Sequence, residues 1–182
     1  MKKVILIYGI IAGTIVAGMM FITMPMFDSG TINFDNGELV GYTTMVIALS
    51  MVFFGVKSYR DNHAGGDITF WSGVKVGLLI TLIAAVMYAL AWEVIYAGKG
   101  DEFNQKMVQH YMDDLKAGGA TEAELAEAKA RWESFGELYK NPIIRFGVTL
   151  MEILPVGIII TLLTAALLRK KEFLPATETV TN

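Results

Sequence analysis

The chain of 182 residues contains no cysteine. This absence excludes disulfide bonds, metal sites built on thiolates and cysteine nucleophiles. Charge is also scarce: Asp, Glu, Lys and Arg make up 18% of the residues, and the basic residues form no patch, so nucleic-acid binding is not expected. The sequence also lacks a nucleotide-binding motif and a recognisable pair of nucleophile and base. We therefore expect neither an enzyme nor a protein that carries a cofactor.

Apolar sequence is present in excess. Hydrophobic residues make up 54% of the chain and the mean hydropathy is +0.48, which is too apolar for an ordinary soluble domain of this length. Four long apolar runs account for the excess, at about residues 4–24, 39–56, 72–97 and 143–168. Each can cross a hydrocarbon core of about 30 Å as a helix, which satisfies its own backbone in lipid. The predicted fold class is all-α, an integral membrane four-helix bundle.

One transmembrane domain is predicted at residues 1–172, followed by a flexible cytoplasmic tail at 173–182. The first run follows Lys2 and Lys3, as the apolar part of a signal peptide would. However, it is longer than the 7–15 residues typical of that part and has no cleavage site of small residues at its end. We expect it to remain as the first transmembrane helix.

The orientation follows from the basic residues at the ends of the spans. The loop at 25–38 has no Lys or Arg, whereas one side of a four-span protein would collect Lys2, Lys3, Lys57, Arg60, Arg169, Lys170 and Lys171. By the positive-inside rule that side is the cytoplasm. The long loop at 98–142 also has six basic residues, but they are mixed with nine acidic ones and lie mostly away from the membrane. We therefore predict a protein of the bacterial cytoplasmic (inner) membrane with both termini in the cytoplasm.

The long loop predicts an extracytoplasmic αα-hairpin at about 101–140, between the third and fourth spans. Asp101 can cap its first helix, Gly118 and Gly119 can end it, and Thr121 with Glu124 forms a capping box for the second. Apolar stripes run along both helices at Phe103, Met107, Tyr111 and Leu115, and at Leu125, Ala128, Trp132, Phe135 and Tyr139. The hairpin is either a structural cap on the bundle or a head that binds a ligand or partner.

Small residues recur at intervals of four in three of the apolar runs. The first run contains Gly9 and Gly13, the third contains Gly73 and Gly77, and the fourth contains Gly157. Such spacing lets helices approach closely in lipid, where no hydrophobic force drives them together. The pattern favours packing within one chain, with pairing of two chains as the alternative.

Glu152 lies about nine residues inside the last apolar run, where an ionisable group costs a few kcal/mol. One interpretation is a neutral carboxyl that is hydrogen-bonded to a neighbouring helix; the other is a site for an ion or proton. Glu93 and Lys75, near the two ends of the third span, are candidate companions, and Arg60 and Asp61 are further candidate functional polar residues. The candidate hydrogen-bond partners are Thr43, Thr44, Ser50 and Tyr88.

The two histidines, His63 and His110, fall on opposite sides of the membrane in this topology and cannot share a site. His110 has helical spacing to Asp113 and Asp114 that could hold a cation, but an exposed helical face explains the same residues. No metal site is predicted.

Several segments resemble a bacterial family of domains of unknown function, the one numbered 4199. They are FFGVKSYRDNHAGG (53–66), ITFWSGVKVGLLITLIA (68–84), the pair Trp92 and Glu93, ELYKNP (137–142) and TLMEILPVGIIITLLTAALLRKK (149–171). The resemblance implies four inner-membrane helices with an extracytoplasmic insertion before the last, and it implies no activity. The matching positions include Arg60, Asp61, Gly66, Phe70, Gly77, Trp92, Glu93, Asn141, Pro142, Glu152, Pro155 and Gly157.

Two functions are compatible with these features. The first is a structural or interaction component of the membrane, with the lipid bilayer and either another membrane protein or a second copy as partners. The alternative is a small transporter or channel subunit in which Glu152 is an intramembrane proton or cation site.

Overall fold

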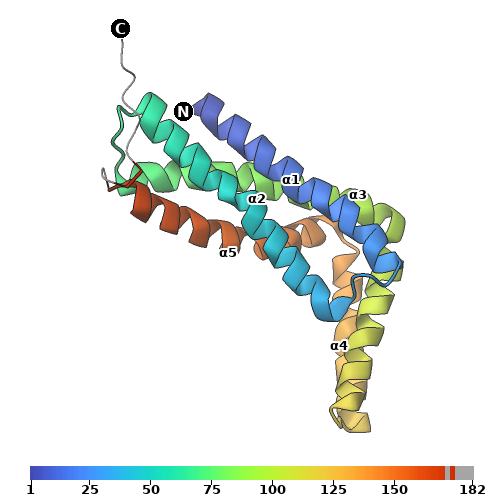
Figure 1. The fold of residues 1–182 in the computed structure, drawn as a ribbon. Helices are drawn as coiled ribbons and strands as arrows, with labels where there is room; N and C mark the ends of the chain where they lie inside the picture. The colour runs from blue at the N-terminus through green and yellow to red at the C-terminus, as the bar shows by residue number, and fades with distance from the viewer. Residues whose placement is uncertain (171–172, 175–182) are drawn as a thin grey trace.

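The computed structural model describes residues 1–170, 173 and 174 and folds them into five helices (Figure 1). In chain order they are α1 (Lys2–Asp28), α2 (Phe34–His63), α3 (Phe70–Ala117), α4 (Glu122–Tyr139) and α5 (Pro142–Leu168). No strand occurs in the described part, which confirms the all-α class. Most of the predicted tail lies outside the described residues; only Phe173 and Leu174 are included.

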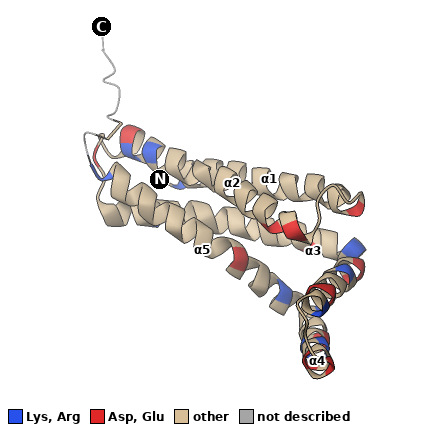
Figure 2. Cartoon of the chain, turned by 60° about the horizontal axis from the view of Figure 1, so that its bottom comes forward, with Lys and Arg blue, Asp and Glu red and all other residues tan. Residues whose placement is uncertain are grey.

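Four of these helices, α1, α2, α3 and α5, are long and apolar enough to cross a membrane, and each contains one of the four apolar runs. Large apolar side chains such as Ile22, Ile47 and Leu163 are more than half exposed on their outer faces. Figure 2 shows that the charged residues gather near the helix ends and around α4, with long uncharged stretches between. The four apolar helices and the apolar outer surface fit a multi-pass membrane protein.

Helix α3 lies between α1 and α5 and contacts both, while α2 packs on α1, α3 and α5. The shared core contains fully buried side chains from α2, α3 and α5, among them Leu49, Val52, Ile80 and Ile153. Since lipid is as apolar as these side chains, close packing has to hold the helices together.

The contact between α3 and α5 combines glycines with threonines. A Cβ atom on Gly77 would lie 2.7 Å from Cγ2 of Thr161, and one on Gly157 would collide with Cγ2 of Thr81. Both threonines are almost fully buried, and their hydroxyl oxygens are 3.4 Å apart. Each glycine therefore makes room for a threonine of the other helix.

The remaining glycines of the predicted packing stripes also lie at helix contacts. Gly9 and Gly13 of α1 face Ile83 and Met87 of α3. Gly73 faces Ala165 of α5, at 3.1 Å from an added Cβ to the alanine Cβ. The structure thus places all five predicted packing glycines against other helices of the same chain.

The sequence predicted that a new helix begins at Asp101. This is wrong, because α3 is one continuous helix of 48 residues that extends from the third apolar run into the hairpin with α4. Gly98 and Gly100 lie inside this helix even though glycine weakens helices. Gly100 leaves room for the Tyr96 ring, whose hydroxyl accepts a hydrogen bond from Asn104 at 3.2 Å. In Figure 1 the outer part of α3 runs in a different direction from the part that packs among the spans.

The outer part of α3 packs against α4. The turn that joins the two helices contains Gly119, which has a positive φ of 84°. The predicted capping box at the start of α4 is present, since Thr121 and Glu124 each accept from the other's backbone amide. Tyr111 stacks on Trp132 with ring centroids 5.1 Å apart. These ring contacts join the two helices of the hairpin.

At the opposite end, Arg60 is 0% exposed although it is charged. It donates hydrogen bonds to the carbonyl oxygens of Phe173, at 2.9 Å, and of Leu174, and its Nε lies 2.7 Å from Asp61. This network fastens the chain that follows α5 to the end of α2.

Candidate functional site

A cavity of about 330 Å³ lies near the hairpin end of the spans. Helices α1, α2 and α3 form most of its wall, α4 contributes one tyrosine, and α5 contributes a threonine and a glutamate. Methionine and aromatic side chains dominate the lining: Met19, Met20, Met24, Met45, Met107, Phe27, Phe34, Tyr88, Trp92, Phe103, Tyr111 and Tyr139. The cavity therefore suits a molecule with a substantial apolar surface.

Glycines on α2 help to leave this space open. A Cβ atom on Gly37 would collide with the ring of Phe27, so the glycine allows α1 and α2 to approach there. A Cβ atom on Gly41, one turn later, would have no neighbour within 4 Å. Gly41 is therefore a lining position that borders open space, with room for at least a Cβ atom.

Glu152 of α5 also lines the cavity. The Tyr88 hydroxyl donates a hydrogen bond to its Oε2 at 3.2 Å, and this is the one hydrogen bond to the carboxyl among the described residues. In the isolated chain Glu152 is exposed, so its side chain is accessible from the cavity. A carboxylate can accept several hydrogen bonds, so most of its acceptor capacity remains available to a molecule in the cavity.

Of the four partners considered for Glu152, the structure places Tyr88 in contact with it. Ser50 instead donates to the carbonyl of Ile47 in its own helix. Thr44 lines the cavity, and Thr43 is exposed. The carboxyl is therefore linked to α3.

An aromatic wall continues from Tyr88 toward the hairpin. Trp92 lies one helical turn after Tyr88 on the same face of α3, and its Nε1 donates to the Tyr139 hydroxyl at 2.8 Å. The Trp92 ring also packs edge-on against Phe103 at 5.4 Å. These contacts present several aromatic rings to the same cavity.

The expected companions of Glu152 lie elsewhere. Glu93 pairs with Arg145 of α5 in a two-point contact, with Nε to Oε1 at 2.9 Å and Nη2 to Oε2 as the second bond. Lys75 is exposed near the start of α3, and Arg60 and Asp61 lie in the last turn of α2. None of these four predicted polar residues lines the cavity.

Arg145 was missed as a site residue although it is only 7% exposed. It also donates to the carbonyls of Tyr139 and Lys140 at 3.1 and 3.3 Å, and its guanidinium lies over the Tyr96 ring, 3.8 Å from the centroid. It therefore fixes the α4–α5 connection and Tyr139. A signal was available, because Arg145 and Glu93 are the sole basic and sole acidic residues of two neighbouring apolar runs.

The charge of the cavity is one-sided. Glu152 and Glu38 are the charged residues of its described lining, which contains no Lys, Arg or His. Arg145 and Glu152 are the two charged residues of α5 and lie seven positions apart; Figure 2 shows one basic and one acidic position on this helix. Since Arg145 is neutralised by Glu93, no basic group of the described chain balances Glu152. A cation could provide the missing charge.

Comparison with known proteins gives one match. A family model described as "Protein of unknown function (DUF4199)" matches residues 7–170, nearly the whole chain. No curated protein and no solved structure matches.

Proposed function

Because the chain belongs to the DUF4199 family, whose description assigns no activity, we propose a function from the cavity: the protein binds a hydrophobic organic cation there, with Glu152 as its counter-charge. The observation that carries the proposal is an apolar, aromatic cavity whose described lining contains an incompletely paired carboxylate and no basic group. It develops the cation-site alternative of the sequence analysis.

Each part of the lining supports this class of ligand. Aromatic faces attract cations, most strongly where water is excluded. Methionine side chains adapt to irregular apolar shapes. An anionic amphiphile such as a fatty acid would instead bring a second negative charge near Glu152 and Glu38, with no basic side chain in the described lining to offset it.

The position in the membrane is also a proposal. The basic residues near Lys2, Lys57 and Arg169 favour a cytoplasmic location for both termini, in the bacterial cytoplasmic membrane. The cavity and the α3–α4 hairpin then lie toward the extracytoplasmic side. A ligand would enter from that side or from the outer part of the bilayer.

We propose a binding role without catalysis. Transport would in addition require a pathway, which four helices rarely enclose alone, so a transporter of this kind would work as a defined oligomer. The rival role as a structural or interaction component is supported by the exposed apolar residues Phe135 and Leu138 on the hairpin. The two roles differ in whether the cavity is ever occupied.

Two ions of matched size and opposite charge, tetraphenylphosphonium and tetraphenylborate, test the proposal. Each is titrated calorimetrically into the purified full chain in detergent, with protein-free micelles subtracted. We expect saturable binding of the cation, weak binding of the anion, and at least a tenfold loss of cation affinity in Glu152→Gln, equivalent to about 1.4 kcal/mol. Equal binding of both ions, or unchanged affinity in Glu152→Gln, would refute the proposal.

A further inference from the structure

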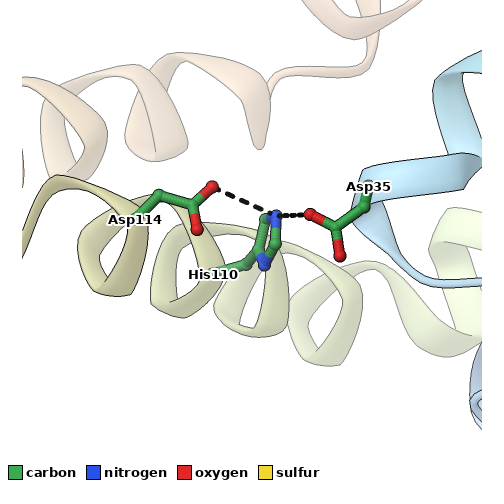
Figure 3. Close-up of side chains that lie close together, drawn as sticks. All are labelled: Asp35, His110 and Asp114. Carbon is green, nitrogen blue, oxygen red and sulfur yellow. Dashed lines mark ion pairs between the residues drawn. The ribbon is translucent and has the colours of Figure 1, made fainter. Parts of the chain in front are cut away.

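Three side chains from two helices converge beside the start of α2 (Figure 3). His110 and Asp114 lie one turn apart on the outer part of α3, and Asp35 comes from the first turn of α2. Their possible ligand atoms all lie within 4.8 Å of one another. The sequence revealed the pair on α3 but not the third member, because the fold alone brings α2 to this place.

Both carboxylates face the same atom of the imidazole. Nε2 of His110 lies 3.5 Å from Oδ1 of Asp35 and 3.4 Å from Oδ2 of Asp114. An N–H group carries one proton in one direction, and good N–H···O hydrogen bonds are about 2.7–3.2 Å long. A hydrogen at Nε2 therefore cannot satisfy both carboxylates.

These separations match a metal coordination shell. In a tetrahedral zinc site the ligand atoms lie about 2.0–2.2 Å from the metal, which places neighbouring ligand atoms roughly 3.3–3.6 Å apart. A nitrogen and two carboxylate oxygens are ligands that zinc accepts, and water can complete the set. The two distances from Nε2 fall in this interval, and the two carboxylate oxygens lie within 4.8 Å of each other.

The surroundings orient the imidazole and leave the carboxylates without another cation. The His110 ring stacks on Phe34, with centroids 5.3 Å apart and planes at 28°. Nearby lysines are engaged elsewhere: Lys106 pairs with Glu102 and Lys116 with Asp113. Among the described residues, His110 is the one basic partner of Asp35 and Asp114.

We propose that Asp35, His110 and Asp114 form a binding site for a divalent first-row metal ion of the zinc type. Bound metal ties the start of α2 to the outer part of α3. Phe34, next to Asp35, both lines the cavity and stacks on His110, so the metal stiffens this edge of the cavity. The site stands on its own residues and does not depend on what the cavity binds.

The test uses the tag-free full chain in detergent, with zinc titrated by calorimetry. We expect one-to-one binding that becomes at least tenfold weaker in Asp35→Asn and in His110→Ala. His63→Ala, which removes the chain's other histidine at the far end of α2, and Asp113→Asn, which removes a neighbouring carboxylate, should bind as the natural protein does. Absence of saturable binding, or full affinity in Asp35→Asn, would overturn the site.

Cobalt provides a readout that needs no variant. Co²⁺ bound to the natural protein should show the strong visible absorption of a tetrahedral complex, and zinc should displace it. A weak octahedral spectrum equal to that of the free ion would contradict the proposal.

Discussion

At the scale of single residues, the charged side chains of the long helices differ in how completely they are paired. Arg145 meets Glu93 at two points and also binds two backbone carbonyls. Arg60 is enclosed by Asp61 and by carbonyl oxygens. Within the described part of the chain, Glu152 receives one hydrogen bond, from Tyr88, and it faces a cavity. Arg145 and Arg60 therefore have structural roles, whereas the Glu152 carboxylate can still accept hydrogen bonds from a ligand.

The Arg145–Glu93 pair predicts a large stability effect. Arg145→Ala should lower the free energy of unfolding by about 2–3 kcal/mol, because it leaves Glu93 and two carbonyls without a charged donor. Unfolding in a denaturing detergent series measures this. Lys140→Ala removes an exposed basic residue from the same connection and should leave stability unchanged. Equal effects in the two variants would contradict the structural role of Arg145.

At the scale of elements, the contacts between helices depend on positions without a side chain. Gly77 and Gly157 each accommodate a threonine of the opposite helix, so α3 and α5 approach more closely than larger residues would allow. The hairpin is held differently, by ring stacking and a capping box. Close packing at glycines suits helices surrounded by lipid, whereas ring stacking and a capping box suit a hairpin surrounded by water.

Adding one methyl group tests the α3–α5 contact. Gly157→Ala should destabilise the protein by about 1–3 kcal/mol, because the new Cβ collides with Thr81 in a filled interface. Gly147→Ala on the same helix, where nothing lies within 4 Å, should be neutral or slightly stabilising through helix propensity. Thermal unfolding of both variants decides. A harmless Gly157→Ala would mean that the helices are less closely packed than described.

The capping box makes the start of α4 sensitive to pH. Hydrogen bonds from the Thr121 amide and hydroxyl lower the pKa of Glu124 below its ordinary value. Because the folded-state pKa is the lower one, the contribution is complete at neutral pH and is lost as the pH falls below about 4. Hydrogen exchange around residues 119–126 should therefore be faster in Glu124→Ala at pH 7, and the difference should shrink in acid. Glu122→Ala, which removes an acid outside the box, should show no such pH-dependent difference.

At the scale of the whole molecule, composition and hydropathy were sufficient to predict the all-α class and four helices that are apolar enough to cross a membrane, because lipid requires apolar helices. The continuity of α3 was not predictable from local signals: Gly98, Gly100 and Asp101 suggest a break, and the packing of Tyr96 over Gly100 overrides them. Glu152 stood out by its depth alone. The cavity beside it, and the approach of Asp35 to His110, depend on how helices distant in sequence are arranged.

The proposed orientation predicts a labelling pattern, and the absence of native cysteine makes the experiment direct. A cysteine at Ala117, at the tip of the hairpin, should react with a membrane-impermeant thiol reagent in intact cells. One at Ala64, after α2, should react only after lysis. The reverse labelling pattern would mean that the protein has the opposite orientation, with the cavity toward the cytoplasmic side.

The central claim, that the cavity beside Glu152 holds a hydrophobic cation, is tested most directly by filling the cavity. Gly41→Leu adds a bulky side chain at a lining position that borders open space and leaves Glu152 itself unchanged, and Gly18→Leu makes the same change at an equally open position of α1 outside the lining. The measurement is the affinity of each variant for tetraphenylphosphonium. We predict at least a tenfold loss in Gly41→Leu and none in Gly18→Leu, with both variants folded; equal affinities in the two would contradict the account.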